Sequence, residues 1–385
     1  MRKSEDRILV THAGRLSSGL PEVAALDVKL NSGDGPGAEE MSRVLDRAVA
    51  DIVEQQLQAG IDVVSDGELA RGRGFGYYKE RMDGIELHDL KAGEVGATVF
   101  RSRERETFKQ YYAAADASRP TVARPKRIVC TAPLRHKSLG VLETEIERFK
   151  AALDGRGAEG FFPVIAPGWI DHFIFNEFYE SDEAFVFALA EVMRPEYQAV
   201  VDAGLILQVD DPGLPDAWPT FIPQPTLETY RRYARLRIDA LNHALEGIPE
   251  EKVRYHCCWG SWAGPHVEDI PFKDIVDLML LVRAQGYSIE AANPRHEHEW
   301  KVWRDVKLPE GKILIPGAVT HRTDTVEHPE VVADRLLNFA RTVGRENVQA
   351  GTDCGMGLGR VHHEVGWAKL RALAEGARLA SRELW

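Results

Sequence analysis

Short apolar segments alternate with amphipathic helical patterns along most of the chain. Eight segments are rich in β-branched and apolar residues and end in Gly, Pro or a polar cluster: 7–14, 60–68, 160–168, 205–213, 253–260, 286–294, 312–320 and 346–355. Segments of this kind are typical of buried parallel strands. Between them, apolar residues recur at helical spacing over 39–60, 181–204, 226–248, 273–286, 328–344 and 364–384. The pattern therefore predicts strands and helices in alternation.

Eight such units predict an α/β protein with a closed (β/α)8 TIM barrel, so that residues 1–385 form a single catalytic barrel. The alternative is an open doubly wound sheet. That fold would favour a glycine-rich phosphate-binding motif after the first strand, and the sequence has none there. The glycine-rich segment 355–360 follows the last predicted strand and does not open a long helix inside it.

Residues 70–159 fit the alternation poorly. They begin with a segment rich in arginine and glycine, and the segment 127–137 reads as one extra strand. A long excursion inside a compact domain is usually functional. We therefore expect residues 70–159 to form an inserted excursion, after the second barrel strand, that lies over the barrel mouth.

Composition excludes some classes of function. The net charge of −12 over 385 residues argues against a nucleic-acid surface, which needs a basic patch. No segment reaches the roughly 18 apolar residues of a membrane span, and the N-terminus lacks the apolar run of a signal peptide. These features predict a cytoplasmic protein with four reduced cysteines and no disulfide. They leave open whether it is a homo-oligomer.

Polar residues gather at the ends of the predicted strands. They are His12, Asp66, Glu68, Asp210, Asp211, His256, Cys258, Glu290, Asp353 and Cys354. In a (β/α)8 barrel the C-terminal ends of the strands carry the chemistry. Because buried charges are costly unless they are paired or bound to metal, this distribution predicts a functional site rather than a decorated core.

The segment VRYHCCWGSW (253–262) suggests a metal centre. On a strand, residues two apart point to the same side, so His256 and Cys258 can reach one ion while Cys257 faces the other way. Cys354 can close the site from another strand. Two thiolates and an imidazole favour Zn²⁺. Glu290 is the best candidate for a fourth ligand, unless that position stays open for substrate.

Other interpretations of these residues remain open from spacing alone. A buried cysteine commonly packs as a small hydrophobic residue, and we expect this of Cys130 and Cys257. The polar segment RHEHEW offers His296 and His298 as competing metal ligands, although it reads as the start of a solvated helix.

Six motifs together are similar to a known family. ILVTHAG, VVSDGE, LQVDDP, HCC, SIEAANPR and GTDCGMG occur in the order seen in the catalytic barrel of cobalamin-independent methionine synthases. The segments FFPVIAPGW and NEFYESDEAF are more similar to a short branch that resembles the epoxyalkane:coenzyme M transferases. The resemblance covers nearly the whole chain and implies a (β/α)8 barrel and a zinc-dependent methyltransferase or other thiol alkyltransferase.

The resemblance also implies roles for individual residues. His256, Cys258 and Cys354 match the family's zinc ligands, and Glu290 matches its glutamate ligand. Glu68 and Asp210 match positions that hold the amino-acid end of a thiol substrate in methionine synthases. The chain departs from the family in being about half as long as methionine synthases that carry a second, N-terminal barrel. It also departs in its first strand, which reads HAGRLSSG where the family has a glycine–serine pair followed by a proline.

These roles predict alkyl transfer to a small thiol from a small-molecule donor. Coordination to zinc would hold the thiol as a thiolate near neutral pH. We expect His321, and otherwise His12, to act as the acid for the leaving group, and Arg15, Arg73 and Arg295 to hold an anionic group of the substrate. The alternatives are a zinc lyase or hydrolase that uses no thiol and a metal-free barrel similar to uroporphyrinogen decarboxylase.

Overall fold

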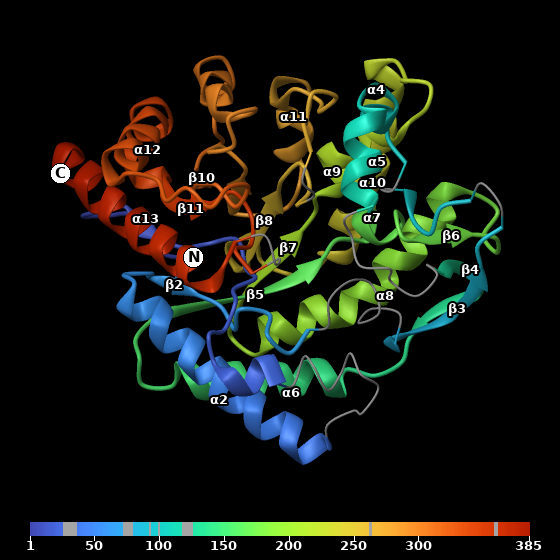
Figure 1. The fold of residues 1–385 in the computed structure, drawn as a ribbon, viewed down its shortest axis with the longest axis horizontal. Coiled ribbons are helices and arrows are strands. Elements are labelled where there is room, and N and C mark those ends of the chain that lie inside the picture. Colours follow the sequence, from blue (N-terminus) through green and yellow to red (C-terminus); the bar gives the residue numbers. More distant parts are fainter. Residues whose placement is uncertain are drawn as a thin grey trace.

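A parallel eight-stranded sheet forms the centre of the computed structural model, which describes residues 1–25, 37–71, 80–91, 94–98, 101–117, 126–261, 264–357 and 361–385. The strand order is β1-β11-β10-β9-β8-β7-β5-β2 (Figure 1). The strands are β1 (Leu9–Val10), β2 (Val63–Val64), β5 (Glu159–Ile165), β7 (Ile206–Asp210), β8 (Val253–Cys257), β9 (Gly286–Ile289), β10 (Ile313–Val319) and β11 (Gln349–Thr352). Each coincides with one of the eight predicted segments, and only β5 begins outside its segment, by one residue.

The sheet curls into a nearly closed barrel, and β1 and β2 meet at its seam. The amide of Asp62 donates to the carbonyl of Val10 at 2.8 Å, and the hydroxyl of Thr11 donates to the carbonyl of Val63 at 2.9 Å. The side chain of Asp62 in turn accepts from the amide of Val10. These contacts join the two ends of the strand order, so the predicted (β/α)8 TIM barrel is confirmed.

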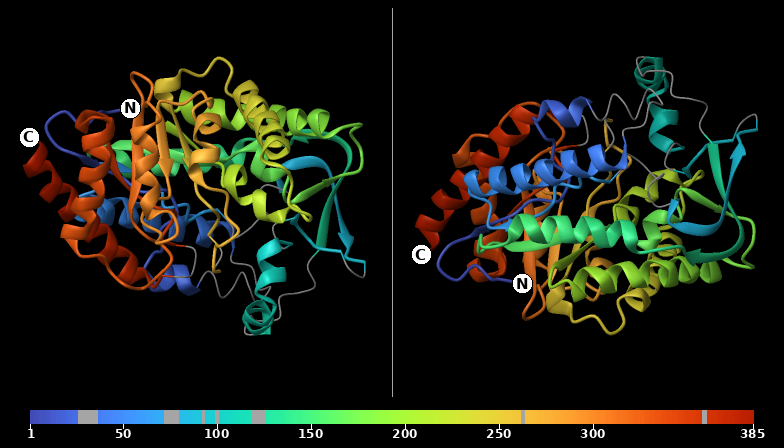
Figure 2. Two further views of the ribbon diagram at one scale, coloured as in Figure 1. Left: turned by 90° about the horizontal axis from the view of Figure 1, so that it is seen from above. Right: turned by 90° about the horizontal axis from the view of Figure 1, so that it is seen from below.

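Long helices cover the outside of the barrel. They are α2 (Ala38–Gln58), α6 (Gly140–Leu153), α8 (Asp182–Asp202), α10 (Leu227–Ala244), α12 (Pro329–Val343) and α13 (His363–Leu384). Each buries an apolar face in the core, and α2 and α6 lie side by side, as do α12 and α13 (Figure 2). Ser181 caps α8 by accepting from the amide of Ala184. Within the described residues, no helix has both the length and the apolar character needed to cross a membrane.

One predicted helix is much shorter than expected. Residues 273–286 contain only a 3₁₀ turn (Phe272–Asp274) and the single-turn helix α11 (Val276–Met279). Side chains compete for the backbone carbonyls that a longer helix would use, because Asn242 donates to Leu281 and Tyr287 donates to Val282. The next unit likewise has a 3₁₀ helix, Glu297–Arg304, in place of an α-helix.

Residues after the second barrel strand build a separate three-stranded sheet to one side of the barrel (Figure 1). In this sheet β3 (Met82–Asp89) pairs antiparallel with β4 (Lys126–His136), which pairs parallel with β6 (Ile174–Asn176). The helices α4 (Arg103–Thr107) and α5 (Lys109–Ala117) lie between β3 and β4 in the chain. That residues 70–159 form one excursion over the barrel mouth stays a prediction. Helix α6 lies within these boundaries but belongs to the helices that cover the barrel.

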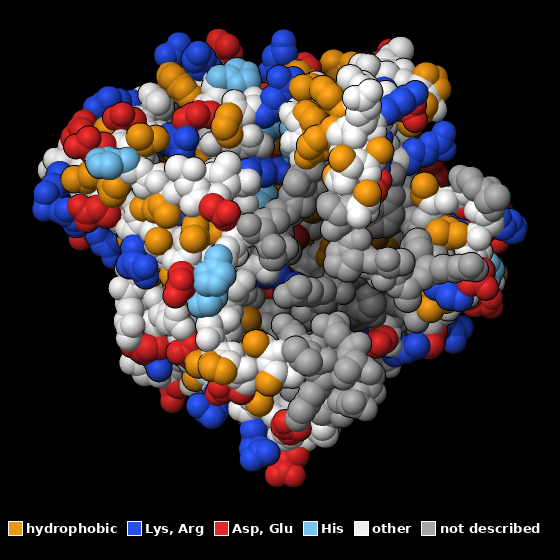
Figure 3. Space-filling model, in the orientation of Figure 1, with side chains coloured by type: hydrophobic (Ala, Val, Ile, Leu, Met, Phe, Trp, Pro, Cys, Tyr) orange, Lys and Arg blue, Asp and Glu red, His pale blue; other side chains and the backbone are white. Residues whose placement is uncertain are grey.

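Loops after β5 and β7 begin with single helical turns, α7 (Pro167–Ile170) and α9 (Gly213–Asp216). The excursion is tied to the loop after β7, because Arg103 donates to the carbonyls of Trp218 and Phe221. The face of the molecule seen in Figure 3 is hollowed near its centre.

Candidate metal centre

Strands β8 and β11 bring the histidine and two of the cysteines together. One ligand atom each of His256, Cys258 and Cys354 lies within 4.8 Å of the others. Cys257 points away from this group and packs in the hydrophobic core, with an exposed fraction of 1%. The strand alternation therefore separates the adjacent thiols, with Cys257 in the core and Cys258 beside Cys354. Cys130 is also buried in the core.

The three donor side chains are held in place by their neighbours. The Nδ1 atom of His256 contacts the Ser288 hydroxyl at 3.1 Å, whereas its buried Nε2 atom has no hydrogen-bond partner among the described residues. Cys258 Sγ lies 3.7 Å from Cys354 Sγ and donates to it, and the Ser261 hydroxyl lies 3.0 Å from Cys354 Sγ. A buried nitrogen without a partner beside two sulfurs is the environment that a bound cation would complete.

The electrostatics of the group also favour a cation. The hydrogen bond from Cys258 lowers the pKa of Cys354 well below its usual value, so the pair shares one proton. Burial disfavours the imidazolium of His256, but the neighbouring Cys354 and Asp210 still raise its pKa. Two sulfurs and one imidazole form a soft donor set that fits Zn²⁺ with one coordination position left over. The residues present therefore fit the metal that the sequence predicts.

Glu290 lies near this group but belongs to a different cluster. Its ligand atom lies within 4.8 Å of those of His321 and Asp353, rather than among the three donors above. Burial alone would raise the pKa of Glu290, but the charge of Arg322 lowers it to about 2. The carboxylate is thus ionised and paired, and whether it also binds the metal stays a prediction.

Asp353 organises the loop that carries Glu290. Its Oδ1 atom accepts from the amides of Ala291 and Ala292, each at 2.7 Å. A Cβ on Gly317 would lie 2.2 Å from this Oδ1 atom, so β10 and β11 approach closely only because residue 317 has no side chain. Burial raises the pKa of Asp353 to about 7.

Glu68 and Asp210 lie half-buried at the same end of the barrel. Asp210 accepts from Gln208 at 2.6 Å, and burial raises its pKa to about 7. Glu68 has the left-handed φ of 55° and lies 3.6 Å from the guanidinium of Arg15. A Cβ on Gly14 would come within 2.5 Å of the Glu68 carboxylate, so this approach requires glycine. Whether Glu68 and Asp210 hold part of a substrate stays a prediction.

The other predicted site residues are spread over several environments. His321 is buried beside Glu290 and Asp353, whereas His12 uses both ring nitrogens, accepting from the amide of Gly14 and contacting Gln56 at 2.7 Å. Burial lowers the pKa of His12 to about 3, so it is neutral. Arg295 is exposed, and its guanidinium donates a hydrogen bond to the carbonyl of Val267. Arg73 lies outside the described residues.

The second aspartate of the DDP motif points into a different environment. Asp211 is buried and accepts from the Tyr255 hydroxyl at 2.8 Å. Burial raises its pKa to about 6, whereas the unfolded value is near 3.9. The folded protein therefore binds the proton more tightly, so this residue contributes stability at low pH that is lost as the pH rises towards 6.

Asp211→Asn should remove this dependence, because an amide can still accept from Tyr255 but carries no charge to bury. We expect the variant to be more stable than the wild type at pH 7 by roughly 1–3 kcal/mol, with the gain vanishing near pH 4. Urea unfolding at both pH values measures the difference. An Asp211→Asn variant that is less stable at pH 7 would contradict this account.

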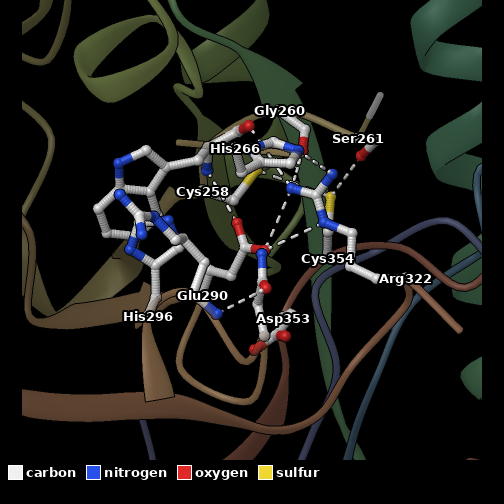
Figure 4. Close-up of polar contacts among 12 residues, drawn as sticks. Cys258, Gly260, Ser261, His266, Glu290, His296, Arg322, Asp353 and Cys354 are labelled. Carbon is white, nitrogen blue, oxygen red and sulfur yellow. Dashed lines mark hydrogen bonds and ion pairs between the residues drawn. The ribbon is translucent and has the colours of Figure 1, made fainter. Parts of the chain in front are cut away.

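Sequence reasoning missed the charged residues behind the centre. The side chains of Arg322, His266 and Asp269 are at most 9% exposed and connect to Glu290 through hydrogen bonds. Figure 4 shows Arg322 between Glu290 and His266. Arg322 directly follows His321 after the end of β10, and this position beside a barrel strand is the feature of the sequence that could have indicated a role for Arg322 in the site. His266 and Asp269 lie in a loop with no motif around them. His296 joins the same cluster rather than the three donors, and His298 is exposed.

Comparison with known proteins gives relatives of similar length. The chain is 23% identical to a methionine synthase of Sulfurisphaera tokodaii, over 93% of this chain and 88% of that one. It is 22% identical to a methionine synthase of Saccharolobus solfataricus, over 93% and 90%. No family model matches. The chain is therefore similar in length to these relatives.

Two solved structures share the fold. A B12-independent methionine synthase from Shewanella sp. W3-18-1, in complex with selenomethionine, aligns with a TM-score of 0.71 at 20% identity, over 98% of this chain and 99% of that one. A putative vitamin-B12-independent methionine synthase from Listeria monocytogenes gives 0.65 at 18% identity, over 98% and 99%. The predicted resemblance to methionine synthases is thus confirmed: the chain is related along nearly its whole length to proteins of that name.

Proposed function

We propose that the protein is a zinc-dependent enzyme that transfers a methyl group, or a related alkyl group, to a small thiol. The observation that carries this proposal is the convergence of His256, Cys258 and Cys354 around the buried, unpartnered Nε2 atom of His256. Three protein ligands with a further position for substrate are typical of catalytic rather than structural zinc. The relationship to methionine synthases supports a thiol as the methyl acceptor.

Zinc bound by this donor set would supply a site that keeps a substrate thiol deprotonated and nucleophilic near neutral pH. The protein's own residues then orient the substrate. Glu68 and Asp210 lie at the same end of the barrel and hold a polar or cationic group of the thiol. Arg15 lies beside Glu68 and offers a contact for an anionic group.

His321 is the proposed acid for the leaving group. It is buried at the end of β10, and its positive charge, when protonated, is stabilised by Glu290 and Asp353, which lie in the same cluster. His12 is not included in the mechanism, because both of its ring nitrogens are already engaged by the protein.

The test is zinc content followed by a reaction screen. Purified protein should carry about one zinc per chain, in line with a single three-ligand site. It should consume L-homocysteine or another small thiol with a methyl donor or an epoxide, and mass spectrometry should detect the thioether. X-ray absorption at the zinc edge should gain a sulfur neighbour when the thiol is added. Zinc without any sulfur gain or thiol consumption would instead support a zinc lyase or hydrolase.

A further inference from the structure

We propose that the end of the barrel opposite the candidate metal centre carries a binding site for a nucleotide, whose phosphate groups contact arginines of the N-terminal segment and of α13. The candidate metal centre lies at the C-terminal ends of the barrel strands, whereas this site lies where β1 and β2 begin. The inference therefore goes beyond the proposed function and does not depend on it.

The first step is a cavity at this end of the barrel. Its volume is about 980 Å³, near the upper end of the range that is typical of small-molecule sites. The end of α2, the residues that lead into β2 and one face of α13 line it. Arg2, Arg7 and Ile8, which precede β1, and Ala158, which precedes β5, complete the lining. The cavity thus joins segments that meet where the barrel strands start.

The second step is the charge of this lining. Six arginines and three acidic residues face the cavity, although the whole chain has a net charge of −12. The arginines are Arg2, Arg7, Arg156, Arg371, Arg378 and Arg382, and the acidic residues are Asp6, Asp62 and Glu375. A positive region on an acidic protein attracts anions. Because the planar guanidinium binds phosphate through two parallel hydrogen bonds, the lining fits a phosphate-bearing ligand.

The third step is that half of these arginines are not committed to a carboxylate. The paired ones are Arg7 with Asp62, Arg156 with Glu54, and Arg378 with Glu375. Among the residues that the structure describes, the side chains of Arg2, Arg371 and Arg382 form no hydrogen bond or ion pair. Arg382 acts on Glu375 only through its charge at longer range. Three guanidinium groups are therefore available to an anion.

A second arginine-lined cavity provides an internal reference. It has a volume of about 590 Å³, lies beside α10 and is lined by three arginines. Each of them is paired with a carboxylate: Arg231 with Asp277, Arg232 with Glu228, and Arg235 with Asp239. An anion would have to displace these carboxylates. Arginine content alone therefore does not distinguish the two cavities, whereas the pairing of the arginines does.

The fourth step is the spacing of the uncommitted arginines on α13. Arg371 and Arg382 are eleven residues apart, which is about three helical turns, so they lie on one face and about 16 Å apart along the helix axis. A ligand that uses both arginines is therefore elongated, as a nucleotide is. Between them, Ala374 and Ala377 face the same cavity, together with Ile61. These side chains offer an apolar surface to a base or a sugar.

The position of the cavity has a consequence for the barrel. Val10 and Asp62 join β1 to β2 at the seam through their backbone groups and the Asp62 carboxylate, and both residues line the cavity. A bound ligand would lie against both sides of the seam. Its binding should therefore oppose the local opening of the barrel between β1 and β2.

The test is calorimetric titration of the full-length protein with ADP. We expect a Kd below about 1 mM, with adenosine and inorganic phosphate binding at least ~10-fold more weakly, because each offers only part of the contacts. The double variant Arg371→Ala/Arg382→Ala should bind ADP at least ~10-fold more weakly, since two charge-assisted contacts are lost. Arg231→Ala/Arg235→Ala is the matched control, because it removes two arginines that are already paired. Its affinity for ADP should equal that of the wild type.

Hydrogen exchange then locates the bound nucleotide. ADP should slow the exchange of the Val10 and Asp62 amides, which form the seam. The inference is overturned if the wild type binds no ADP, if Arg371→Ala/Arg382→Ala binds ADP as tightly as the wild type, or if ADP binds without protecting these amides. If the double variant does not fold by circular dichroism, Arg2→Ala decides instead: ADP binding should weaken several-fold, and an unchanged affinity would count against the site.

Discussion

Replacing Cys354 by serine should remove the metal and with it the activity. A hydroxyl is a harder and far less acidic donor than a thiol, so the soft three-residue set is broken. We expect zinc content to fall from about one per chain to below about 0.1, and alkyl transfer to fall at least ~100-fold. Metal analysis by mass spectrometry and a thioether assay measure the two effects.

The neighbouring cysteines supply the control. Cys257→Ala changes the residue next to a proposed ligand, but its side chain lies in the core. This variant should keep its zinc and its activity and lose only about 1 kcal/mol of stability. If Cys257→Ala loses zinc while Cys354→Ser keeps it, the centre has been placed on the wrong cysteines.

Replacing His321 by asparagine should slow the reaction while leaving the zinc in place. Without the acid, the leaving group departs as an anion, and general acid catalysis is worth about 10²–10⁴ in rate. We expect kcat to fall within this range, with zinc content unchanged and the KM for the thiol altered little. The pH dependence of kcat should lose the limb that corresponds to titration of the acid.

His12→Asn is the comparison for this prediction. His12 is buried at the end of β1 and bonds to Gln56 and to the backbone of Gly14. We expect a lower melting temperature, because two buried hydrogen bonds are disturbed, and a kcat within about threefold of the wild type. A large loss of kcat in His12→Asn together with a normal rate in His321→Asn would exchange the roles of the two residues.

The sequence was sufficient to predict the barrel and the convergence of His256, Cys258 and Cys354 for physical reasons. Buried parallel strands are short, apolar and bounded by glycine or polar residues, and this pattern survives in a single sequence. The spacing of His256 and Cys258 follows directly from the alternation of side chains along a strand. The shortened helix at 273–286 was mispredicted because the side chains of Asn242 and Tyr287, which bind its carbonyls, come from other elements.

The network behind Glu290 could not be predicted for a related reason. Arg322, His266 and Asp269 meet only because the loops after β8 and β10 fold against each other. No local period or motif encodes such a contact between distant loops. The sequence can thus show which residue types stand at the strand ends, but the pairing of Glu290 requires the tertiary structure.

The closeness of Cys258 and Cys354 has a consequence for the metal-free protein. Their sulfur atoms lie 3.7 Å apart, and Cys354 is the better nucleophile because its pKa is low. A peroxide that removes two electrons from this pair would join the sulfurs covalently and abolish the donor set. If the proposed metal binds there, it would also protect the thiols, and protein prepared in chelator and air would lose the proposed activity until a reductant restores both thiols.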